Sequence, residues 1–294
     1  MRLAIITGAD SAYFELMEKL LTALSSARAG QSYDLCVLDF GLSADQVATA
    51  TGFGATVVRP EWAFDAPANV RTTSNLGYGT RPILPRYFPG YDLYLWLDAD
   101  ISVQDDKFIS SFTAASMDGS LAIAEEVDRS YQLEPYALKW QIGNAFRCFG
   151  IRDGLKLCLG RPINSGVFAL RGDAPHWAIW QQRYQQAIDR AGRANLDQHA
   201  LMAALYLDDM PCRYLDSTHN WICTRSQPLW DEVDQVFRRP YAPFEKIDVL
   251  HLAGRHKDKL WDVKTLRGAT RRMYLSYCRR QEGLSNGEPE VAIV

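Results

Sequence analysis

The sequence has no apolar run that approaches the roughly 18 residues needed to span a membrane, and the apolar run at its start is far too short for a secretory signal. From these two absences we expect a cytoplasmic protein. Positive charge is not in excess either, because the formal net charge is -3. This balance argues against a protein that coats nucleic acid through its overall charge, although it is compatible with a local basic patch.

Paired cysteine motifs and complete glycine-rich loops are also absent. Six cysteines are scattered without C-x-x-C spacing, mostly in apolar surroundings, which favours buried reduced thiols over disulfides or a zinc site. The glycine pairs at residues 52–54 and 77–79 are too incomplete for a dinucleotide site, and turns explain them. Without an internal repeat, a low-complexity segment or a clear linker, we expect one domain over residues 1–262 and a C-terminal segment over residues 263–294.

What the sequence does have is the periodicity of an α/β protein. Strand-like apolar runs at residues 3–7, 33–39 and 55–58 alternate with two helical patterns, the first with apolar positions from Phe14 to Leu24 and the second capped by Ser43. Right-handed crossovers turn this β-α-β-α-β order into a parallel, doubly wound half of the kind that binds nucleotides.

The remainder of the chain continues the alternation with less regular spacing. We expect a loop at residues 61–75 and strands at residues 93–97, 121–125, 163–170, 212–215 and 247–252. We expect helices at residues 80–87, 106–115, 133–159 with a break at Gly150, 175–191 and 196–207. The predicted fold class is α/β, with a mostly parallel central sheet flanked by helices.

The strand at residues 93–97 stops abruptly at Asp98-Ala99-Asp100. Ligands of an open α/β sheet bind beyond the carboxyl ends of its strands, and side chains two apart in an extended segment point the same way. A carboxylate pair in that place suits Mg²⁺ or Mn²⁺, which in turn hold phosphate oxygens. The alternative is that the two aspartates only cap a turn.

A second polar group follows the strand at residues 247–252, where His251, Gly254 and Lys257 occur in order. A histidine at a strand end can bind metal, a glycine lets the backbone approach a phosphate, and a lysine supplies charge for a diphosphate. A structural histidine and a solvated lysine are the alternatives.

Other polar residues interrupt apolar segments. Asn164-Ser165-Gly166 lies inside a strand-like run, which either a ligand or a β-bulge explains. Asp197 begins a helix, where capping competes with a ligand role, and Arg81 opens another, where it reaches a phosphate or sugar or stays on the surface.

Taken in order, these segments resemble the motifs of glycosyltransferase family eight, which includes bacterial lipopolysaccharide galactosyl- and glucosyltransferases and glycogenin. The matching positions are Arg81, residues 95–100, residues 163–167, Asp197-Gln198, and His251 with Gly254 and Lys257. The resemblance covers about residues 3–261. It implies a GT-A nucleotide-diphospho-sugar transferase fold, a UDP-sugar donor, retention at the anomeric carbon, and Mn²⁺, with Mg²⁺ as the alternative ion.

The resemblance also implies roles by position. Asp98, Asp100 and His251 would hold the metal, with Ala99 between the carboxylates, and Gly254 and Lys257 would face the diphosphate. Thr7, Asp10 and Tyr13 would lie by the base and ribose, and Arg81, Asn164 and Asp197 would hold hydroxyls of the donor sugar. Ala99, Ser165 and Gly166 are further residues expected to bind the donor. The catalytic candidates are Gln198 near the anomeric carbon, Asp197, and an acceptor-side acid, for which we take Glu125 while Glu126 and Asp128 stay open.

Retention ordinarily calls for a carboxylate nucleophile close to the anomeric carbon. With Gln198 there instead, a front-side route in which the departing phosphate acts as base is the more natural hypothesis. The family usually has a proline directly after the lysine, whereas residues 258–260 intervene here before Trp261, which leaves the role of Trp261 open. The loops at residues 133–161 and 217–239, where acceptor specificity is expected, have no readable pattern.

Two other function classes compete with this prediction. A phosphatase of the haloacid dehalogenase kind also has an apolar strand that ends in Asp-x-Asp, but that strand is normally the first, and Gly172-Asp173 lacks the second acid expected at Trp177. A non-catalytic binder of sugar nucleotides or glycans is the third possibility.

The C-terminal segment has a basic pattern. Its Lys and Arg residues interleave with Leu266, Met273, Tyr274 and Tyr277, which predicts either an amphipathic helix on an anionic membrane or a packed terminal helix with a solvated face. The predicted partners are therefore a nucleotide-sugar donor, a carbohydrate or glycolipid acceptor and, through this helix, a membrane surface; nucleic acid is not among them.

Overall fold

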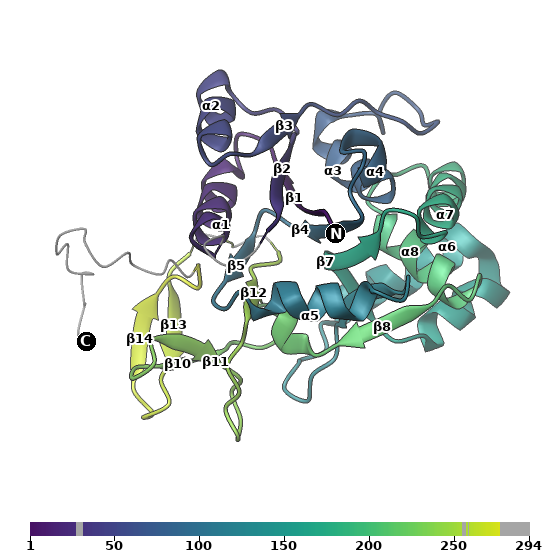
Figure 1. Ribbon diagram of the computed structural model, residues 1–294. Coiled ribbons are helices and arrows are strands. Elements are labelled where there is room, and N and C mark those ends of the chain that lie inside the picture. The colour runs from purple at the N-terminus through teal and green to yellow at the C-terminus, as the bar shows by residue number, and fades with distance from the viewer. Residues whose placement is uncertain (28–31, 255–256, 258, 277–294) are drawn as a thin grey trace.

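The computed structural model describes residues 1–27, 32–254, 257 and 259–276. Its centre is a seven-stranded sheet in the order β3-β2-β1-β4-β7-β6-β8, with helices on both faces (Figure 1). The strands are β1 (Leu3–Ala9), β2 (Asp34–Asp39), β3 (Thr56–Val58), β4 (Leu93–Leu97), β6 (Leu121–Glu125), β7 (Ile163–Arg171) and β8 (Cys212–Leu215). Only β7 runs antiparallel to its neighbours, so the predicted α/β class with a mostly parallel sheet is confirmed.

The N-terminal half is the predicted β-α-β-α-β unit, with helices α1 (Phe14–Ala27) and α2 (Ala44–Gly52). Ser43 caps α2 through a capping box: Ser43 Oγ accepts from Gln46 N, and the Gln46 side chain accepts from Ser43 N. Since β1 pairs in parallel with both β2 and β4, the carboxyl ends of these strands meet at one edge of the sheet.

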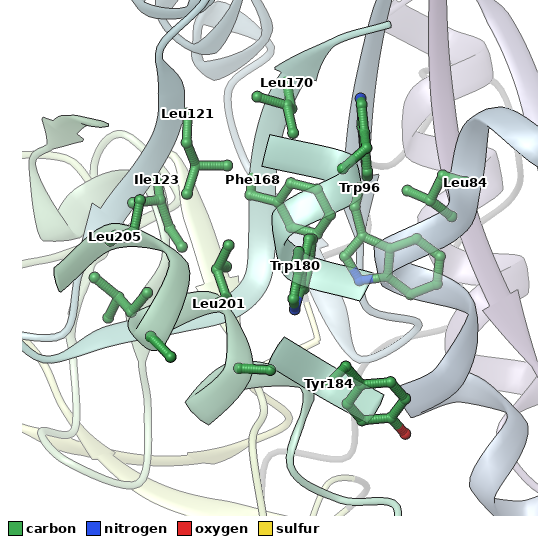
Figure 2. Packing of buried hydrophobic residues seen from close by; sticks show 14 of the residues in the cluster. Leu84, Trp96, Leu121, Ile123, Phe168, Leu170, Trp180, Tyr184, Leu201 and Leu205 are labelled. Atoms are coloured by element: carbon green, nitrogen blue, oxygen red, sulfur yellow. The ribbon is translucent and has the colours of Figure 1, made fainter. Parts of the chain in front are cut away.

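Alternating side chains of the sheet divide the core into two layers. On one face Trp96 and Phe168 pack with residues of α7 (His176–Ala191) and α8 (Asp197–Tyr206), among them Trp180 (Figure 2). On the other face Leu95 packs with residues of α1 and α5 (Lys107–Ser116). Covered on both faces, β4 buries every one of its residues, and the chain leaves the sheet at Asp98.

Two of the predicted helices are interrupted, one at prolines and the other at a glycine. The helix expected at residues 80–87 is divided into α3 (Leu76–Thr80), the 3₁₀ turn η3 (Arg81–Ile83) and α4 (Leu84–Tyr87), because Pro82 and Pro85 each lack the backbone donor of a continuous helix. The segment before it is the predicted loop except for the 3₁₀ turn η2 (Thr73–Asn75). Helix α6 (Pro135–Leu159) has the predicted break, because Gly150 has a φ of 80°. Within the described residues, no helix combines the length and apolarity that crossing a membrane requires.

A second, three-stranded sheet in the order β5-β12-β9 brings distant segments together. Its strands are β5 (Ile101–Val103), β12 (Val249–His251) and β9 (Trp221–Ile222), and a 3₁₀ turn, η4 (Ser217–His219), precedes β9. β12 runs antiparallel to β5, with His251 opposite Ile101, and Leu252 N donates to Asp100 O at 3.0 Å. This sheet is the reason that residue 251 lies beside residue 100.

The C-terminal part forms hairpins, so the predicted basic helix is wrong over residues 263–276. β10 (Leu229–Asp231) pairs with β11 (Val236–Arg238), and β13 (Trp261–Lys264) pairs antiparallel with β14 (Thr270–Met273). Val263 is buried while Asp262 and Lys264 are exposed, which is a strand's alternation, and Gly268 in the turn has a φ of 85°. The boundary expected after residue 262 falls inside β13, and the basic residues Arg279 and Arg280 lie outside the described residues.

The described cysteines are all free thiols. Cys36, Cys148 and Cys223 are buried, as expected, and Cys212 is partly buried. Cys158, on the last turn of α6, is exposed instead. Cys278 lies outside the described residues.

Candidate active site

Two aspartates stand where β4 leaves the main sheet. Asp98 N donates a hydrogen bond to Gly166 O at 2.8 Å, and Ile101 N donates to Asp98 O at 3.0 Å, which closes the turn that contains Ala99. The carboxylate of Asp100 is almost fully buried, and that of Asp98 is partly exposed. Both carboxylates make contacts outside the turn, so the simple turn-capping alternative does not account for them.

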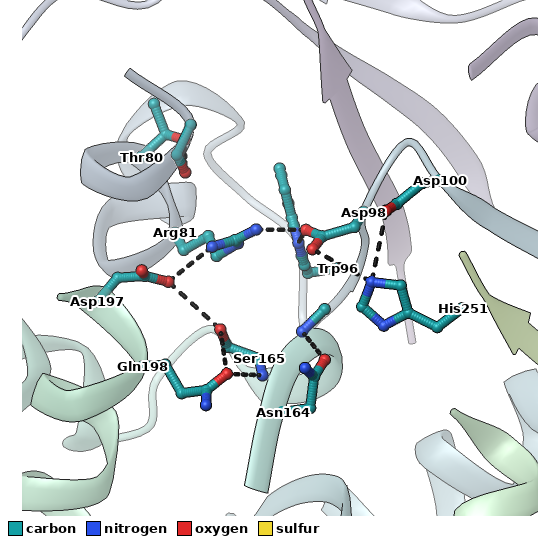
Figure 3. Close-up of polar contacts among 12 residues, drawn as sticks. Thr80, Arg81, Trp96, Asp98, Asp100, Asn164, Ser165, Asp197, Gln198 and His251 are labelled. Carbon is teal, nitrogen blue, oxygen red and sulfur yellow. Dashed lines mark hydrogen bonds and ion pairs between the residues drawn. The ribbon is translucent and has the colours of Figure 1, made fainter. Parts of the chain in front are cut away.

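His251 forms a cluster with these carboxylates. Its Nε2 lies 3.5 Å from Asp100 Oδ1 and 3.9 Å from Asp98 Oδ2 (Figure 3). One potential ligand atom of each residue lies within 4.8 Å of the other two. Two carboxylate oxygens and one imidazole nitrogen form a donor set that suits a divalent cation.

Two neighbours fix the position of the imidazole. His251 Nδ1 lies 3.0 Å from Asn220 Oδ1, so a proton on Nδ1 is donated to Asn220 and the lone pair of Nε2 is left on the carboxylate side. Gly166 lies against the other side of the ring, where an added Cβ would be 2.4 Å from His251 Cε1. The sequence predicts Gly166 as a donor-binding residue, and this close approach to His251 is a separate reason for a glycine at this position.

Lys257 adds a positive charge next to Asp100. Its Nζ lies 2.6 Å from Asp100 Oδ2 and 4.5 Å from the centre of the Tyr13 ring. Burial alone would raise the pKa of Asp100, but His251 and Lys257 outweigh it and hold this pKa well below its ordinary value. Burial lowers the pKa of His251, whereas Asp100 and Asp98 raise it, and the net direction is upward.

Arg81 connects Asp98 to Asp197 on the other side of the site. Its Nη1 donates to Asp197 Oδ2 at 2.7 Å, and its Nη2 donates to Asp98 Oδ1, which also accepts from Trp96 Nε1 at 2.7 Å. Burial is the largest effect on Asp197 and raises its pKa, while Arg81 opposes that rise. The guanidinium is therefore a largely covered bridge between two carboxylates rather than a surface group.

The polar run in β7 faces the start of α8. Ser165 N donates to Gln198 Oε1 at 3.1 Å, and Ser165 Oγ donates to Asp197 Oδ2 at 3.3 Å. Asn164 Oδ1 accepts from Gly166 N at 2.9 Å and from Asn220 Nδ2 at 3.2 Å. Figure 3 shows the bonds that Ser165 makes with Asp197 and Gln198. Since Asn220 also contacts His251 Nδ1, Asn164 and Ser165 together connect the Asp197 side of the site to the His251 side.

The residues expected near the base and ribose lie at the end of β1. Thr7 is buried, and its Oγ1 has no hydrogen-bond partner among the described residues. Asp10 Oδ1 accepts from Ala12 N and Tyr13 N at 3.0 and 3.1 Å. Tyr13 is 40% exposed and meets the site through Lys257.

Gly254 also lies near the site, in the segment that follows β12. It has a φ of 102°, a conformation that favours glycine. Its neighbours Arg255 and His256 lie outside the described residues.

The structure separates the three acids considered for the acceptor side. Glu125 forms a partly exposed ion pair with Arg161 at 3.1 Å, and Asp128 accepts hydrogen bonds from Ser130 and Tyr241. Neither acid belongs to the cluster of Asp98, Asp100 and His251. The geometry therefore does not support Glu125 as the acceptor-side acid. Strand β6 ends at Glu125, and the Glu125 side chain pairs with the exposed Arg161.

Glu126 is the acid that reaches the site. Arg225 donates to Glu126 Oε1 from Nε at 3.0 Å and from Nη2 at 2.9 Å. Burial raises the pKa of Glu126, and the opposing influences include Arg225, His251 and a hydrogen bond with Asn164. Arg225 and Asn220 are functional candidates that the sequence did not reveal, since both lie in the loop region without a readable pattern.

Comparison with known proteins gives matches among solved structures. No family model matches the chain, and no curated protein does. The galactosyltransferase LgtC, in complex with donor and acceptor sugar analogs, matches with a TM-score of 0.53 and 20% identity over 85% of this chain and 87% of its own. Mouse xyloside xylosyltransferase 1 matches at 0.52 and 13% over 89% and 100%. The bifunctional glycosyltransferase WbbM matches at 0.54 and 13% over 86% of this chain and 46% of its own.

At 13–20% identity, these matches show that the chain shares a fold with the three proteins. The chain has the mixed α/β fold of these glycosyltransferases, the GT-A fold, which confirms the predicted fold and the structural side of the resemblance.

Proposed function

We propose that the chain is a metal-dependent glycosyltransferase that moves a hexose from a UDP-sugar to a glycan or to a glycolipid of the lipopolysaccharide type, with retention. The observation that carries the proposal is the convergence of Asp98, Asp100 and His251 at the carboxyl edge of a GT-A sheet, with ligand atoms within 4.8 Å of one another. In line with the sequence, we place this activity in the cytoplasm. The function of each residue named below is part of the proposal.

The donor set supports a divalent cation. Two ligand atoms on an octahedral ion with bonds of about 2.1 Å are separated by roughly 3 Å when adjacent and roughly 4.2 Å when opposite. The separations of 3.5 and 3.9 Å from His251 Nε2 to the two carboxylates fall between these values. Asn220 supplies the outer hydrogen bond that such a histidine needs, and the nitrogen ligand favours Mn²⁺ over Mg²⁺.

A bound ion would neutralise charge that develops on the departing diphosphate. Lys257 adds to this from the protein: its ammonium is held at 2.6 Å from Asp100, where it can pair with a phosphate oxygen as well. Gly254 precedes Lys257 and has a φ of 102°, a backbone conformation that a side chain would strain, so glycine is suited to a turn that faces a phosphate.

The donor sugar fits beside the Arg81 bridge. Arg81 and Asp197 form a partly buried ion pair that can hold sugar hydroxyls, and Asn164 and Ser165 lie nearby in β7. The side-chain oxygen of Gln198 is anchored by Ser165 N, and its Nε2 has no hydrogen-bond partner among the described residues. Because Asp197 is already paired with Arg81, we favour the front-side route over a covalent intermediate on that carboxylate.

The acceptor would approach from the side of Glu126. Its carboxylate is buried, is held by Arg225, and lies beside Asn164. We propose Glu126 in place of Glu125 as the acid that orients the acceptor hydroxyl. The substitution Glu126→Gln should reduce sugar transfer while UDP-sugar hydrolysis persists.

The alternatives have less support. Three strands of the main sheet precede β4 in the chain, whereas a phosphatase of the haloacid dehalogenase kind has its aspartate pair after the first strand. Asp98 is also bound by Arg81 and Trp96 rather than left available as a nucleophile. None of the three structural neighbours described above is a phosphatase or a non-catalytic binder by its description.

The proposal is tested by thermal-shift screening of UDP-, GDP- and TDP-sugars with and without Mn²⁺, followed by donor hydrolysis on each hit. We expect stabilisation by a UDP-sugar that depends on Mn²⁺, and slow hydrolysis that EDTA removes. Asp100→Asn and His251→Ala should each lower the Mn²⁺-dependent hydrolysis by about 100-fold or more.

A matched control is Asp118→Asn, because Asp118 pairs with Arg213 on the surface, away from the cluster. Such exposed pairs contribute little, so this variant should keep wild-type hydrolysis. Release of phosphate from p-nitrophenyl phosphate without UDP-sugar binding would favour the phosphatase. Mn²⁺-dependent binding without turnover of any donor or acceptor would favour the binder.

A further inference from the structure

A cavity of about 190 Å³ lies between α6, α8 and the segment that follows β6. Its walls are mostly apolar, and come from Leu133, Leu138, Ile142, Ala145, Leu157 and Met202. Cys158 lines it from the end of α6. None of these residues belongs to the site described above.

The cavity shares one wall with that site. Glu126 and Arg225 line it, and the same Glu126 carboxylate lies beside Asn164. Gln132 N donates to Arg225 O at 2.9 Å, which fixes the segment over the cavity. A molecule with a hydroxyl group at Glu126 can therefore extend directly into the cavity.

One polar atom in the wall lacks a partner. His199 is 2% exposed, lines the cavity, and follows Gln198 in α8. Its Nε2 lies 3.2 Å from Gln141 O, while its Nδ1 has no hydrogen-bond partner among the described residues. With Nε2–H donating to the carbonyl, Nδ1 is an acceptor enclosed within the wall of the cavity.

The volume and lining define the chemistry of an occupant. An engineered apolar cavity of about 150 Å³ stays dry and binds benzene. A cavity of about 190 Å³ is thus large enough for one aryl ring or a short alkyl chain. The exposed side chains of Leu133 (80%), Leu138 (41%) and Ile142 (37%) stand among the lining residues, where an apolar ligand would cover them.

We infer that this cavity binds an apolar group that the acceptor carries next to the sugar that receives the transfer, an aryl ring or a short alkyl segment. The inference rests on the proposed function, because it takes Glu126 as the acceptor side of the site. The occupant is part of the acceptor rather than a second copy of the chain, because the cavity is continuous with Glu126 and has the volume of one ring.

The first test measures binding without catalysis. Cys158 is the exposed thiol among the described residues, so its alkylation by iodoacetamide reports on the cavity in a Cys278→Ser background. Phenyl and methyl β-glycosides of galactose, glucose and xylose are compared as protecting ligands, with the alkylated residue identified by mass spectrometry. For at least one sugar, the concentration of phenyl glycoside that halves the alkylation rate of Cys158 should be roughly ten-fold lower than that of the methyl glycoside. Burial of the ring predicts this difference.

The second test measures transfer to the same glycosides. In the wild type, KM for the phenyl glycoside should be roughly ten-fold below KM for the methyl glycoside. Cys158→Trp fills the cavity mouth and should bring this KM ratio close to one. Leu159→Trp adds the same ring at an adjacent exposed residue outside the cavity lining, and should keep the ratio.

Equal protection by phenyl and methyl glycosides, or none, overturns the inference whatever the activity. A wild-type dimer that Cys158→Trp converts to a monomer also overturns it, because the cavity would then belong to an interface between copies. If the phenyl glycoside protects Cys158 selectively but the protein hydrolyses no UDP-sugar, the proposed function is refuted. The cavity is then still shown to bind an apolar group. The two failures are therefore distinct.

Discussion

Gly166 and His251 come from strands of different sheets, and their contact leaves no space for a side chain at residue 166. An added Cβ would lie 2.4 Å from His251 Cε1 and 2.9 Å from Nδ1. We expect Gly166→Ala to displace the imidazole and to weaken Mn²⁺ binding by about 10-fold or more, although every ligand residue is still present. Calorimetric titration of Mn²⁺ checks this, and unchanged affinity would contradict it.

Asn220 acts on the same histidine through a hydrogen bond. Its Oδ1 accepts from His251 Nδ1 at 3.0 Å, which keeps the Nε2 lone pair on the carboxylate side. Loss of such an outer hydrogen bond typically costs 10- to 100-fold in metal affinity, so we expect about that loss for Asn220→Ala.

The measurement for Asn220→Ala is Mn²⁺ affinity, with unfolding of the metal-free protein as a parallel readout. Thr224→Ala is a control from the same segment, because Thr224 is near Gly254 but not hydrogen-bonded to His251. If Asn220→Ala loses stability but binds Mn²⁺ normally, the asparagine only supports the fold.

At this scale, the sequence predicted residues whose type and place are both unusual. Asp98 and Asp100 follow a wholly apolar strand, and His251 ends another, so the sequence identifies them as candidates without knowledge of any contact. Asn220 and Glu126 are ordinary polar residues beside loops, and their roles come from contacts with Asn164 and His251 that only tertiary structure creates.

Among the elements, α6 shows how a glycine divides a helix. Gly150 has a φ of 80° and a ψ of -177°, a region that other residues occupy only with strain, and this kink lets Gly154 lie against Phe146. Gly150→Ala should therefore lower the free energy of unfolding by about 1–3 kcal/mol. Urea unfolding followed by tryptophan fluorescence measures it.

The same helix offers a matched control with the opposite sign. Gly143 lies in the regular part of α6, and an added Cβ there would meet nothing within 4 Å. Gly143→Ala should raise the free energy of unfolding by about 0.5–1 kcal/mol, because alanine loses less backbone entropy on folding. Destabilisation by both substitutions would show that α6 tolerates no added methyl group.

Elements were predictable where local pattern and tertiary burial agree. The central strands β1 and β4 have apolar runs that are buried, and the break at Gly150 has its own residue signal. The strands β5 and β9 have three and two residues, too few for a period, and they exist because β12 pairs with both. The basic residues of β13 and β14 resembled a helix face because a hairpin with one buried Val263 shows little periodicity.

For the whole molecule, the site depends on two sheets that fold from distant parts of the chain. The main sheet supplies Asp98 and Asn164, and the small sheet supplies His251. Arg81 then ties α8 to the main sheet through Asp197. Disruption of the small sheet would therefore separate His251 from Asp98 and Asp100, so the motifs at residues 98 and 251 form one candidate site only when both sheets are in place.

Acid stability is a property of the whole molecule that His199 should control in part. Burial lowers its pKa from 6.5 to about 4, against a smaller opposing hydrogen bond to Gln141. Above pH 6.5 the histidine is neutral in both the folded and unfolded states, and it contributes no pH dependence. As the pH falls below 6.5, the unfolded chain binds the proton and the folded chain does not, so stability falls until the pH reaches about 4.

The expected size of this effect follows from the two pKa values. Between about pH 7.5 and about pH 5, wild-type protein should lose about 2 kcal/mol more stability than His199→Gln, which has no titrating group. Urea unfolding at both pH values measures the difference, and Met202→Leu, a substitution of similar volume in the same helix, should keep the wild-type pH dependence. Carboxylates with lowered pKa values, such as Asp105 and Asp216, titrate below this window and act equally on all three proteins. If wild type and His199→Gln lose stability in parallel, His199 takes up its proton in the folded protein as readily as in the unfolded chain, and burial does not lower its pKa.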